Sequence, residues 1–205
     1  MARPGRELVI ETATAACSVA LIEDGVVIAA LHETVGRGHA ERLIPMIAEL
    51  PGAGRADVIR VDCGPGSFTG IRVGLAAARA LGLGWGVPVS GFSSLSLIAA
   101  AVADPPATLA VAIGGGHGEL FVQRFRTAPL QPIEPVFSAR PEAAARIGEA
   151  LVVGGGADAL VSARGSGEAR DVEANAANIA RLQDELVALP PHPIYVRAPD
   201  ARPPD

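Results

Sequence analysis

The sequence predicts an α/β fold of two lobes, in which the second lobe is a reduced version of the first. Both halves show the same expected order of three strands, a helix, a strand and a helix, which is typical of a repeated α/β unit. The 205 residues are enough for two small lobes, because a chain of this length buries about 70% of its unfolded surface. The turn residues Asp104-Pro105-Pro106 mark the boundary. We therefore expect an N-terminal lobe at residues 1–104 and a smaller C-terminal lobe with an extended proline-rich tail at residues 105–205.

The first half opens with three strands and a helix. Leu8–Ile10 is a short apolar run, and residues 17–23 and 26–34 are two further apolar segments joined by Asp24-Gly25. An Asp-Gly pair between such segments is the strongest short-range signal for a β-hairpin. Within His39–Leu50 the apolar residues recur at the spacing of an amphipathic helix. These patterns predict three consecutive antiparallel strands followed by a helix.

The stretch from Val58 to Trp85 is the most informative part of the chain. An apolar strand ends in the turn Gly64-Pro65-Gly66, and an alanine-rich helix follows from Thr69 to Trp85, with Ser67 or Thr69 placed to cap its first amides. Small residues recur at every fourth position of this helix, at Gly70, Gly74, Ala78 and Gly82. Such a face lets another helix approach closely. We interpret it as a surface for a partner helix, the alternative being packing against the chain's own sheet.

The same patterns predict the remaining elements. The first half ends with a strand at Val87–Val89 and a helix that begins at Ser93 or Ser94 and continues to Ala103. The second half is expected to contain strands at residues 108–113, 119–125, 133–138 and 151–153, and helices at residues 141–150 and 174–189. Polar, glycine-containing residues 157–173 predict a mobile loop. The six prolines of residues 190–205 predict an extended strap.

The composition excludes several classes of function. All 17 basic residues are arginines, so the P-loop, Schiff-base and kinase mechanisms that need a lysine are excluded. The net charge is −5 without a basic block, which makes the chain alone a poor candidate for gripping a nucleic-acid backbone. Cys17 and Cys63 form neither a disulfide framework nor a metal-finger spacing, and the polar start does not resemble a secretory signal. We expect a cytoplasmic protein that does not bind membranes.

Three loops have the composition to bind phosphate on backbone amides at helix N-termini. They are Glu11–Thr14 after the first strand, Gly114–Gly116 after the first strand of the second half, and Gly154–Gly156 after a later strand. Two lobes that face each other across these loops would form a nucleotide cleft. For each loop taken singly, a tight turn between short strands is the plainer interpretation.

The histidines provide little evidence for metal or acid–base chemistry. The chain contains His32, His39, His117 and His192. No two of them have the spacing of a helical metal site, and we predict neither a metal nor a cofactor. His39 lies near a helix start, where it could cap the helix or contact a partner.

Nucleophiles and paired carboxylates are also sparse. Ser67 lacks the glycine spacing of a nucleophile elbow, so a helix cap is the better interpretation. Glu11 and Asp62 follow strands and are expected at the same edge of the sheet. There they could bind a metal-nucleotide or cap loops, and we favour caps. No catalytic residue is predicted.

Several segments resemble the TsaB family, also called YeaZ. The most specific is Gly64–Gly74 (GPGSFTGIRVG). The others are Leu8–Leu21 (LVIETATAACSVAL), Gly38–Pro45 (GHAERLIP), Gly91–Leu95 (GFSSL) and Ile194–Arg197 (IYVR). The resemblance covers nearly the whole chain and is densest from residue 8 to residue 98.

The resemblance implies an actin-like, Hsp70-like fold with RNase H-like lobes, in a group formerly named glycoprotease-like. It also implies a place in the bacterial machinery that puts threonylcarbamoyl on adenosine 37 of tRNAs reading ANN codons. In that family the protein is non-catalytic and forms a heterodimer with its catalytic paralogue TsaD. The ATPase TsaE joins through the complex, tRNA binds only through the complex, and a homodimer forms when TsaD is absent. An ATP-binding phosphotransferase of the actin-like fold is the alternative function.

The expected partner surface lies on the helices at residues 39–50 and 69–85. Its residues are His39, Arg42, Leu43, Met46, Ile47, Thr69, Gly70, Arg72, Val73, Gly74, Ala77, Ala78 and Leu81. The chain departs from the family in two places: Glu11 replaces a common aspartate, and Gly114–His117 replaces a common Asp-Ala-Arg-Arg. The second departure predicts a looser hairpin without the contacts of those polar residues.

Overall fold

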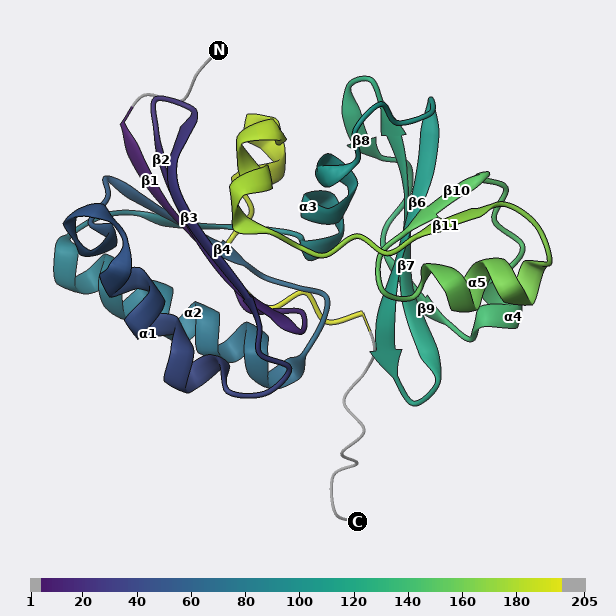
Figure 1. Cartoon of the computed structure of the whole chain (residues 1–205), viewed down its shortest axis with the longest axis horizontal. Helices are drawn as coiled ribbons and strands as arrows, with labels where there is room; N and C mark the ends of the chain where they lie inside the picture. Colours follow the sequence, from purple (N-terminus) through teal and green to yellow (C-terminus); the bar gives the residue numbers. More distant parts are fainter. Residues whose placement is uncertain (1–4, 197–205) are drawn as a thin grey trace.

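A computed structural model describes residues 5–196 as two mixed β-sheets with helices packed around them (Figure 1). The first sheet has the strand order β3-β2-β1-β4-β5. Its strands are β1 (Arg6–Glu11), β2 (Ala16–Glu23), β3 (Val26–Thr34), β4 (Val58–Asp62) and β5 (Val89–Phe92). Strands β1, β2 and β3 are antiparallel, whereas β1, β4 and β5 are parallel. The expected hairpin is confirmed, because Asp24 and Gly25 both adopt the positive φ of its turn.

Helices cover both faces of the first sheet. α1 (His39–Glu49) and α2 (Phe68–Trp85) pack on one face, while α3 (Ser94–Ala101) and the 3-10 helix η2 (Ala176–Arg181) fill the space between the two sheets (Figure 1). Strand β1 contributes to both layers. Leu8 and Ile10 belong to the core beneath α1 and α2, and Val9 belongs to the core between the sheets. Nearly all of β1 is therefore buried.

The second sheet has the order β11-β10-β6-β7-β8, and β9 also pairs with β7. Its strands are β6 (Thr108–Gly116), β7 (Glu119–Thr127), β8 (Leu130–Pro132), β9 (Phe137–Ala139), β10 (Leu151–Val153) and β11 (Glu168–Arg170). The short helices α4 (Pro141–Ala144) and α5 (Ala157–Arg164) cover the face that points away from the first sheet (Figure 1). The predicted two-lobed α/β fold, with lobes of the βββαβα type, is confirmed.

The prediction of a mobile loop at residues 157–173 is wrong, because α5 and β11 occupy this stretch. Leu160 anchors α5 in the core against the second sheet. Gly165 and Gly167 adopt positive φ, so the first ends the helix and the second turns the chain into β11. The glycines that suggested mobility instead form a helix C-cap and a tight turn.

The helix expected at residues 174–189 is also wrong. This stretch forms two 3-10 helices, η2 and η3 (Asp184–Val187). The side chain of Asn175 accepts a hydrogen bond of 2.9 Å from the Ala177 amide and so starts η2. Ile179 is buried between the two sheets. Packing in this confined space therefore prevails over the helical spacing of the apolar residues.

Three other elements differ in extent. The strand expected at residues 133–138 is replaced by β8 and β9, which lie on either side of Pro135. The strand expected at residues 87–89 begins only after Pro88. Proline has no amide to donate to a β-ladder, which explains both shifts. The helix expected at residues 141–150 ends at Ala144.

The end of the described chain returns to the first lobe as an extended strap. Leu189 exchanges backbone hydrogen bonds with Gly91, and the Ile194 amide donates to the Cys63 carbonyl oxygen over 2.8 Å. Residues 190–196 thus run along the first lobe, and the continuation of the expected strap at 197–205 lies outside the described residues. The division between lobes at Asp104 stays a prediction.

Across residues 5–196, no helix combines the length and apolar character that crossing a membrane requires.

Candidate functional site

The structure divides the predicted partner-surface residues into an inner and an outer group. The inner group is buried in the first lobe and contains His39, Leu43, Met46, Ile47, Gly70, Gly74 and Ala78. The outer group is exposed or partly exposed and contains Arg42, Thr69, Arg72, Val73, Ala77 and Leu81. Only the outer group can touch another molecule without unfolding the lobe.

The small-residue face of α2 packs on the chain itself, so its interpretation as an open surface for a partner helix is wrong. A Cβ atom on Gly74 would lie 2.5 Å from Thr12 Oγ1, and one on Gly82 would lie 2.5 Å from Val89 Cγ2. A Cβ on Gly70 would collide with the Thr12 carbonyl oxygen. The glycines allow α2 to lie directly on the first sheet and on the turn that follows β1. A change of Gly74 to Leu therefore tests folding rather than partner binding.

His39 has an internal role. Its Nε2 atom lies 3.1 Å from the Thr14 carbonyl oxygen and 3.0 Å from the Ala16 carbonyl oxygen. The residue is 6% exposed, and it makes no side-chain cap for α1, which begins after Gly38. His39 thus holds the turn between β1 and β2 against α1.

The outward faces of α1 and α2 carry large apolar side chains in water. Ile44 is 50% exposed, Phe68 58% and Leu83 87%. Arg42 of α1 is partly buried and pairs with Glu33 at 2.6 Å and with Glu49 at 2.8 Å. None of Ile44, Phe68 and Leu83 was among the predicted contact residues. Their signal in the sequence was that each is an apolar residue outside the inward-facing set of its helix.

An arginine and two aromatic rings join the start of α2 to the strap. The guanidinium carbon of Arg72 lies 3.4 Å from the centroid of the Phe68 ring, and its Nη2 atom donates to Tyr195 Oη over 3.2 Å. The two rings are 6.3 Å apart. Phe68 and Tyr195 are each 58% exposed, so this cluster presents aromatic surface to solvent.

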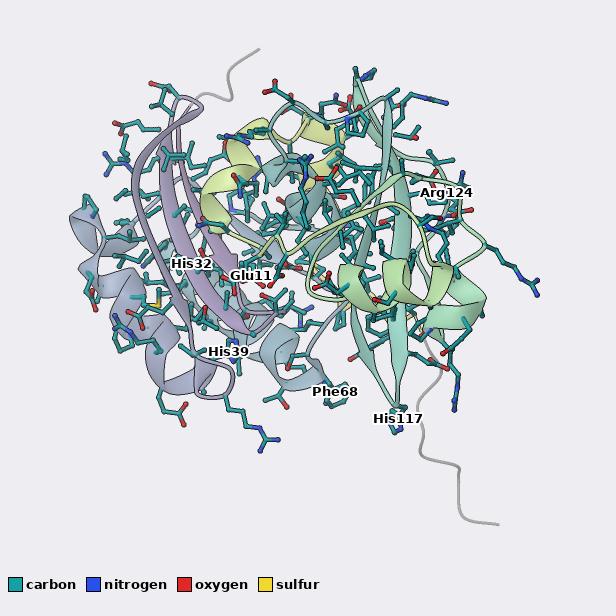
Figure 2. All side chains as sticks on the ribbon, turned by 45° about the vertical axis from the view of Figure 1, so that its right-hand side comes forward. Glu11, His32, His39, Phe68, His117 and Arg124 are labelled. Carbon is teal, nitrogen blue, oxygen red and sulfur yellow. The ribbon has the colours of Figure 1, made fainter. Side chains whose placement is uncertain are left out.

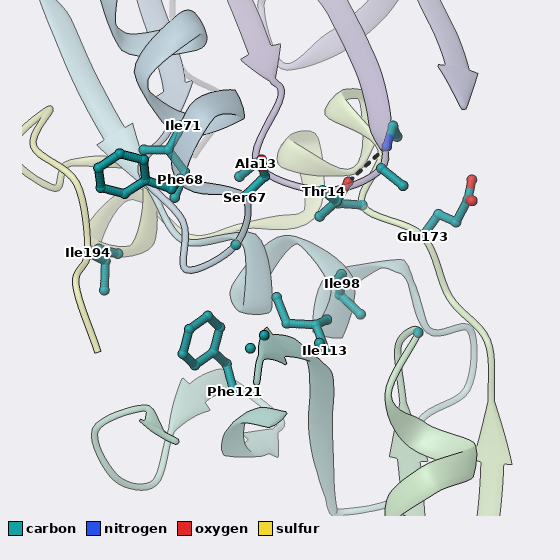
Figure 3. A pocket seen from close by; sticks show the side chains of 18 of the residues that line it. Ala13, Thr14, Ser67, Phe68, Ile71, Ile98, Ile113, Phe121, Glu173 and Ile194 are labelled. Carbon is teal, nitrogen blue, oxygen red and sulfur yellow. Dashed lines mark hydrogen bonds between the residues drawn. The ribbon is translucent and has the colours of Figure 1, made fainter. Parts of the chain in front are cut away.

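A cleft of about 1080 Å³ lies between the lobes beside this cluster. Apolar side chains form much of its wall, with Ile71 and Ile194 on one side and Ile98, Ile113 and Phe121 on the other (Figure 3). Parts of all three loops that were considered for phosphate binding line this cleft, namely Ala13 and Thr14, Gly114–Gly116, and Gly155. Phe68 of the first lobe and His117 of the second both reach it (Figure 2).

The charged residues of the cleft do not form a phosphate-binding set. Arg72 is the single arginine among the lining residues that the structure describes, and its guanidinium is stacked on Phe68. Asp171 and Glu173 also line the cleft. Glu173 is already engaged, because its Oε2 atom lies 2.9 Å from His32 Nε2.

The three polar residues considered for catalysis act as caps, as predicted. Ser67 Oγ accepts a hydrogen bond of 3.2 Å from the Gly70 amide at the start of α2. Glu11 Oε1 accepts from the Ala13 and Thr14 amides, and Asp62 Oδ1 accepts from the Gly64 amide over 2.6 Å. Both carboxyl groups are fully buried. Burial raises the pKa of Asp62 to about 7, and burial together with the Asp62 charge raises the pKa of Glu11 well above its usual range.

Comparison with known proteins identifies the group to which this chain is related. Residues 30–138 match the family model described as TsaD, tRNA N6-adenosine threonylcarbamoyltransferase. The tRNA threonylcarbamoyladenosine biosynthesis protein TsaB of Escherichia coli K12 is 42% identical over 99 residues, which are 46% of this chain and 42% of that protein. TsaB of Haemophilus influenzae is 39% identical over 99 residues, with the same two shares. A crystal structure of a Pseudomonas aeruginosa protein with similarity to the peptidase YeaZ matches 94% of this chain and 99% of its own, with a TM-score of 0.78 and 25% identity.

The chain belongs to the TsaB (YeaZ) family. The family is related to TsaD, and the chain is a homologue of proteins of threonylcarbamoyladenosine biosynthesis. Its alignment spans less than half the length of the curated relatives that it matches, namely 42% of each of the first two.

One departure from the TsaB pattern has a structural explanation. Gly114–His117 lie at the end of the β6–β7 hairpin, where Gly116, His117 and Gly118 all have positive φ. The pairing of the two strands shifts register between Gly114 and Gly116. The glycines at the tip therefore allow a bulged turn at the edge of the cleft.

Proposed function

We propose that this TsaB-family chain is a non-catalytic scaffold for TsaD in the formation of N6-threonylcarbamoyladenosine at position 37 of tRNAs that read ANN codons. The observation that carries the proposal is the exposure of Ile44, Phe68 and Leu83 on two adjacent helices. The inward faces of these helices are already used by the first sheet, so internal packing does not account for the outer residues.

The outer surface of α1 and α2 has the features of a protein interface. It offers exposed apolar side chains, and α1 also carries Arg42 with two neutralising carboxylates. Arginine and aromatic residues are the commonest contributors to binding energy at interfaces, and Arg72 with Phe68 lies at one end of this surface. The paralogue TsaD is the proposed occupant, and a second copy of the chain would use the same surface when TsaD is absent.

A scaffold role agrees with the chemistry of the chain. Ser67 Oγ caps α2, and Glu11 and Asp62 are fully buried and hold backbone amides, so these three residues have structural roles in the chain. The net charge of −5 supports tRNA binding through the complex rather than by this chain alone. We propose that TsaE also joins through the complex, and that the assembly acts in the cytoplasm.

The introduction of a negative charge on the proposed surface tests this function. Ile44→Glu and Leu83→Glu, made separately, should each weaken co-purification with TsaD by at least about tenfold, because a buried carboxylate without a partner is costly. The amount of threonylcarbamoyladenosine that each variant forms together with TsaD and TsaE should decrease along with TsaD binding. Mass spectrometry of digested tRNA measures this amount.

The matched control is Ile133→Glu, since Ile133 is 40% exposed but lies between β8 and β9 of the second lobe. Thermal unfolding should show that all three variants are folded. Equal TsaD binding by Ile44→Glu, Leu83→Glu and Ile133→Glu would place the interface elsewhere.

One observation favours the alternative of an ATP-binding phosphotransferase, namely the glycine-containing loops that line the inter-lobe cleft. The charges of the cleft argue against this alternative. Asp171 and Glu173 would repel the negative charge of a triphosphate, and the guanidinium of Arg72 is already stacked on Phe68. Calorimetric titration of the free chain with Mg-ATP separates the two functions. Micromolar binding with turnover would replace the scaffold proposal.

A further inference from the structure

Glu11 and Asp62 form a buried acidic pair at the ends of two neighbouring strands of the first sheet. Each is the last residue of its strand, and β1 and β4 are parallel neighbours whose register pairs Ile10 with Val61. Glu11 and Asp62, the next residue of each strand, therefore lie side by side at the same edge of the sheet. Both residues are 0% exposed.

Each carboxyl group has one satisfied and one unsatisfied oxygen. Glu11 Oε1 accepts from the amides of Ala13 and Thr14 at 2.9 and 3.0 Å. Asp62 Oδ1 accepts from the Gly64 amide at 2.6 Å and from Ser94 Oγ at 2.8 Å. Glu11 Oε2 and Asp62 Oδ2 have no hydrogen-bond partner among the residues that the structure describes.

Among residues 5–196, the groups around the pair do not supply a neutralising cation. Cys17 of β2 and Cys63 after β4 are buried neighbours whose thiols feel the negative charge of Glu11 and Asp62, respectively. From α3 comes the hydroxyl of Ser94, and from α1 comes His39, which is directed at backbone carbonyl oxygens. The positive charges of Arg42 and Arg79 lower the pKa of the Cys17 and Cys63 thiols, respectively, and are not among the causes of the raised pKa values of Glu11 and Asp62. Two unpaired carboxylates in this site would be strongly unfavourable.

We propose that Glu11 and Asp62 together retain one proton at neutral pH, and that this proton stabilises the turns that follow β1 and β4. A protonated carboxyl oxygen is a donor, so one proton removes a buried charge and supplies the donor that the two unsatisfied oxygens lack. The inference concerns the free chain and does not depend on TsaD binding.

The proton matters for the cleft because the pair organises the loops that line it. Glu11 holds Ala13, whose carbonyl oxygen accepts a hydrogen bond of 2.7 Å from the Ser67 amide immediately before α2. Asp62 holds Gly64 and, through Ser94, the start of α3. Loss of the proton would place two negative charges side by side at the residues that hold Ala13, Gly64 and Ser94, and their repulsion would destabilise the first lobe.

The direction of the pH dependence follows from the raised pKa values. An unfolded carboxyl group titrates near about pH 4, whereas the pKa of Asp62 in the folded chain is about 7. The stabilisation is fully present below the unfolded pKa and is lost as the pH rises through the folded pKa.

Asp62→Asn and Glu11→Gln test the inference in the full chain, since an amide supplies a donor without a charge. The unfolding constant of the wild type, divided by that of each variant, should rise by up to about tenfold per pH unit between about pH 5 and pH 7. Glu142→Gln, which removes an exposed carboxylate of α4, should leave the ratio constant. A constant ratio for both pair variants would overturn the inference.

Infrared spectroscopy of the wild type provides a readout that needs no variant. At about pH 6.5 exposed carboxyl groups are ionised, and the buried Glu7 and Glu149 are paired with Arg60 and Arg124. A carbonyl stretch of a protonated carboxyl group should therefore come from this pair and should vanish at alkaline pH. The absence of that band would show that the pair holds no proton, even if the variants failed to fold.

Discussion

Thr12 Oγ1 donates a hydrogen bond of 2.8 Å to the carbonyl oxygen of Gly70, a residue 58 positions later in the chain. The same hydroxyl group would lie 2.5 Å from a Cβ atom on Gly74. This contact fixes the rotation of α2 on the first sheet, so that the glycines point inward and the larger side chains of the opposite face point to solvent.

Gly74→Ala should therefore destabilise the first lobe. The added methyl group forces Thr12 or α2 to move, with an expected cost of about 1–3 kcal/mol in the free energy of unfolding. Gly84→Ala is the matched control in the same helix, because nothing lies within 4 Å of its Cβ position. Alanine at that site should stabilise the chain by about 0.5–1 kcal/mol through better helix propensity. Urea unfolding measures both changes. If Gly74→Ala stabilised the chain and Gly84→Ala destabilised it, the packing of α2 described above would be contradicted.

Arg72→Ala should loosen the strap without unfolding the lobe. The change removes the stacking on Phe68 and the hydrogen bond to Tyr195, which for exposed groups are worth about 0.5–1 kcal/mol. Hydrogen exchange at the Ile194 amide, which donates to Cys63, should become a few times faster. The amide of Val9 in the core should not change, and faster exchange at both sites would indicate general destabilisation instead.

The two cysteines should resist alkylation in the folded chain. Burial raises the pKa of the Cys17 thiol to about 11 and that of the Cys63 thiol to about 12, and the thiolate is the reactive form. At about pH 8 the thiolate fraction of Cys17 should be about a hundredfold lower than in an unfolded chain. Mass spectrometry after iodoacetamide treatment, with and without urea, measures the difference. Rapid modification of the native chain would show that these strand ends open to solvent.

Local patterns predicted much of the first lobe because its strands and helices have consistent signals. The Asp24-Gly25 hairpin, the Ser67 cap and the capping roles of Glu11 and Asp62 all depend on neighbours within a few residues. Prediction failed where the environment was decided by distant segments. Residues 174–189 have helical spacing but lie as 3-10 helices between the sheets.

The sequence by itself determined that α2 has a face of small residues, because side chains four positions apart share one side of a helix. It also determined the two-lobed α/β order and the family motif at Gly64–Gly74. Only the tertiary structure decided that the small face is covered by Thr12 and the first sheet, leaving Phe68 and Leu83 exposed. Periodicity defines the faces of a helix, but the side that is buried depends on the surface against which the chain folds.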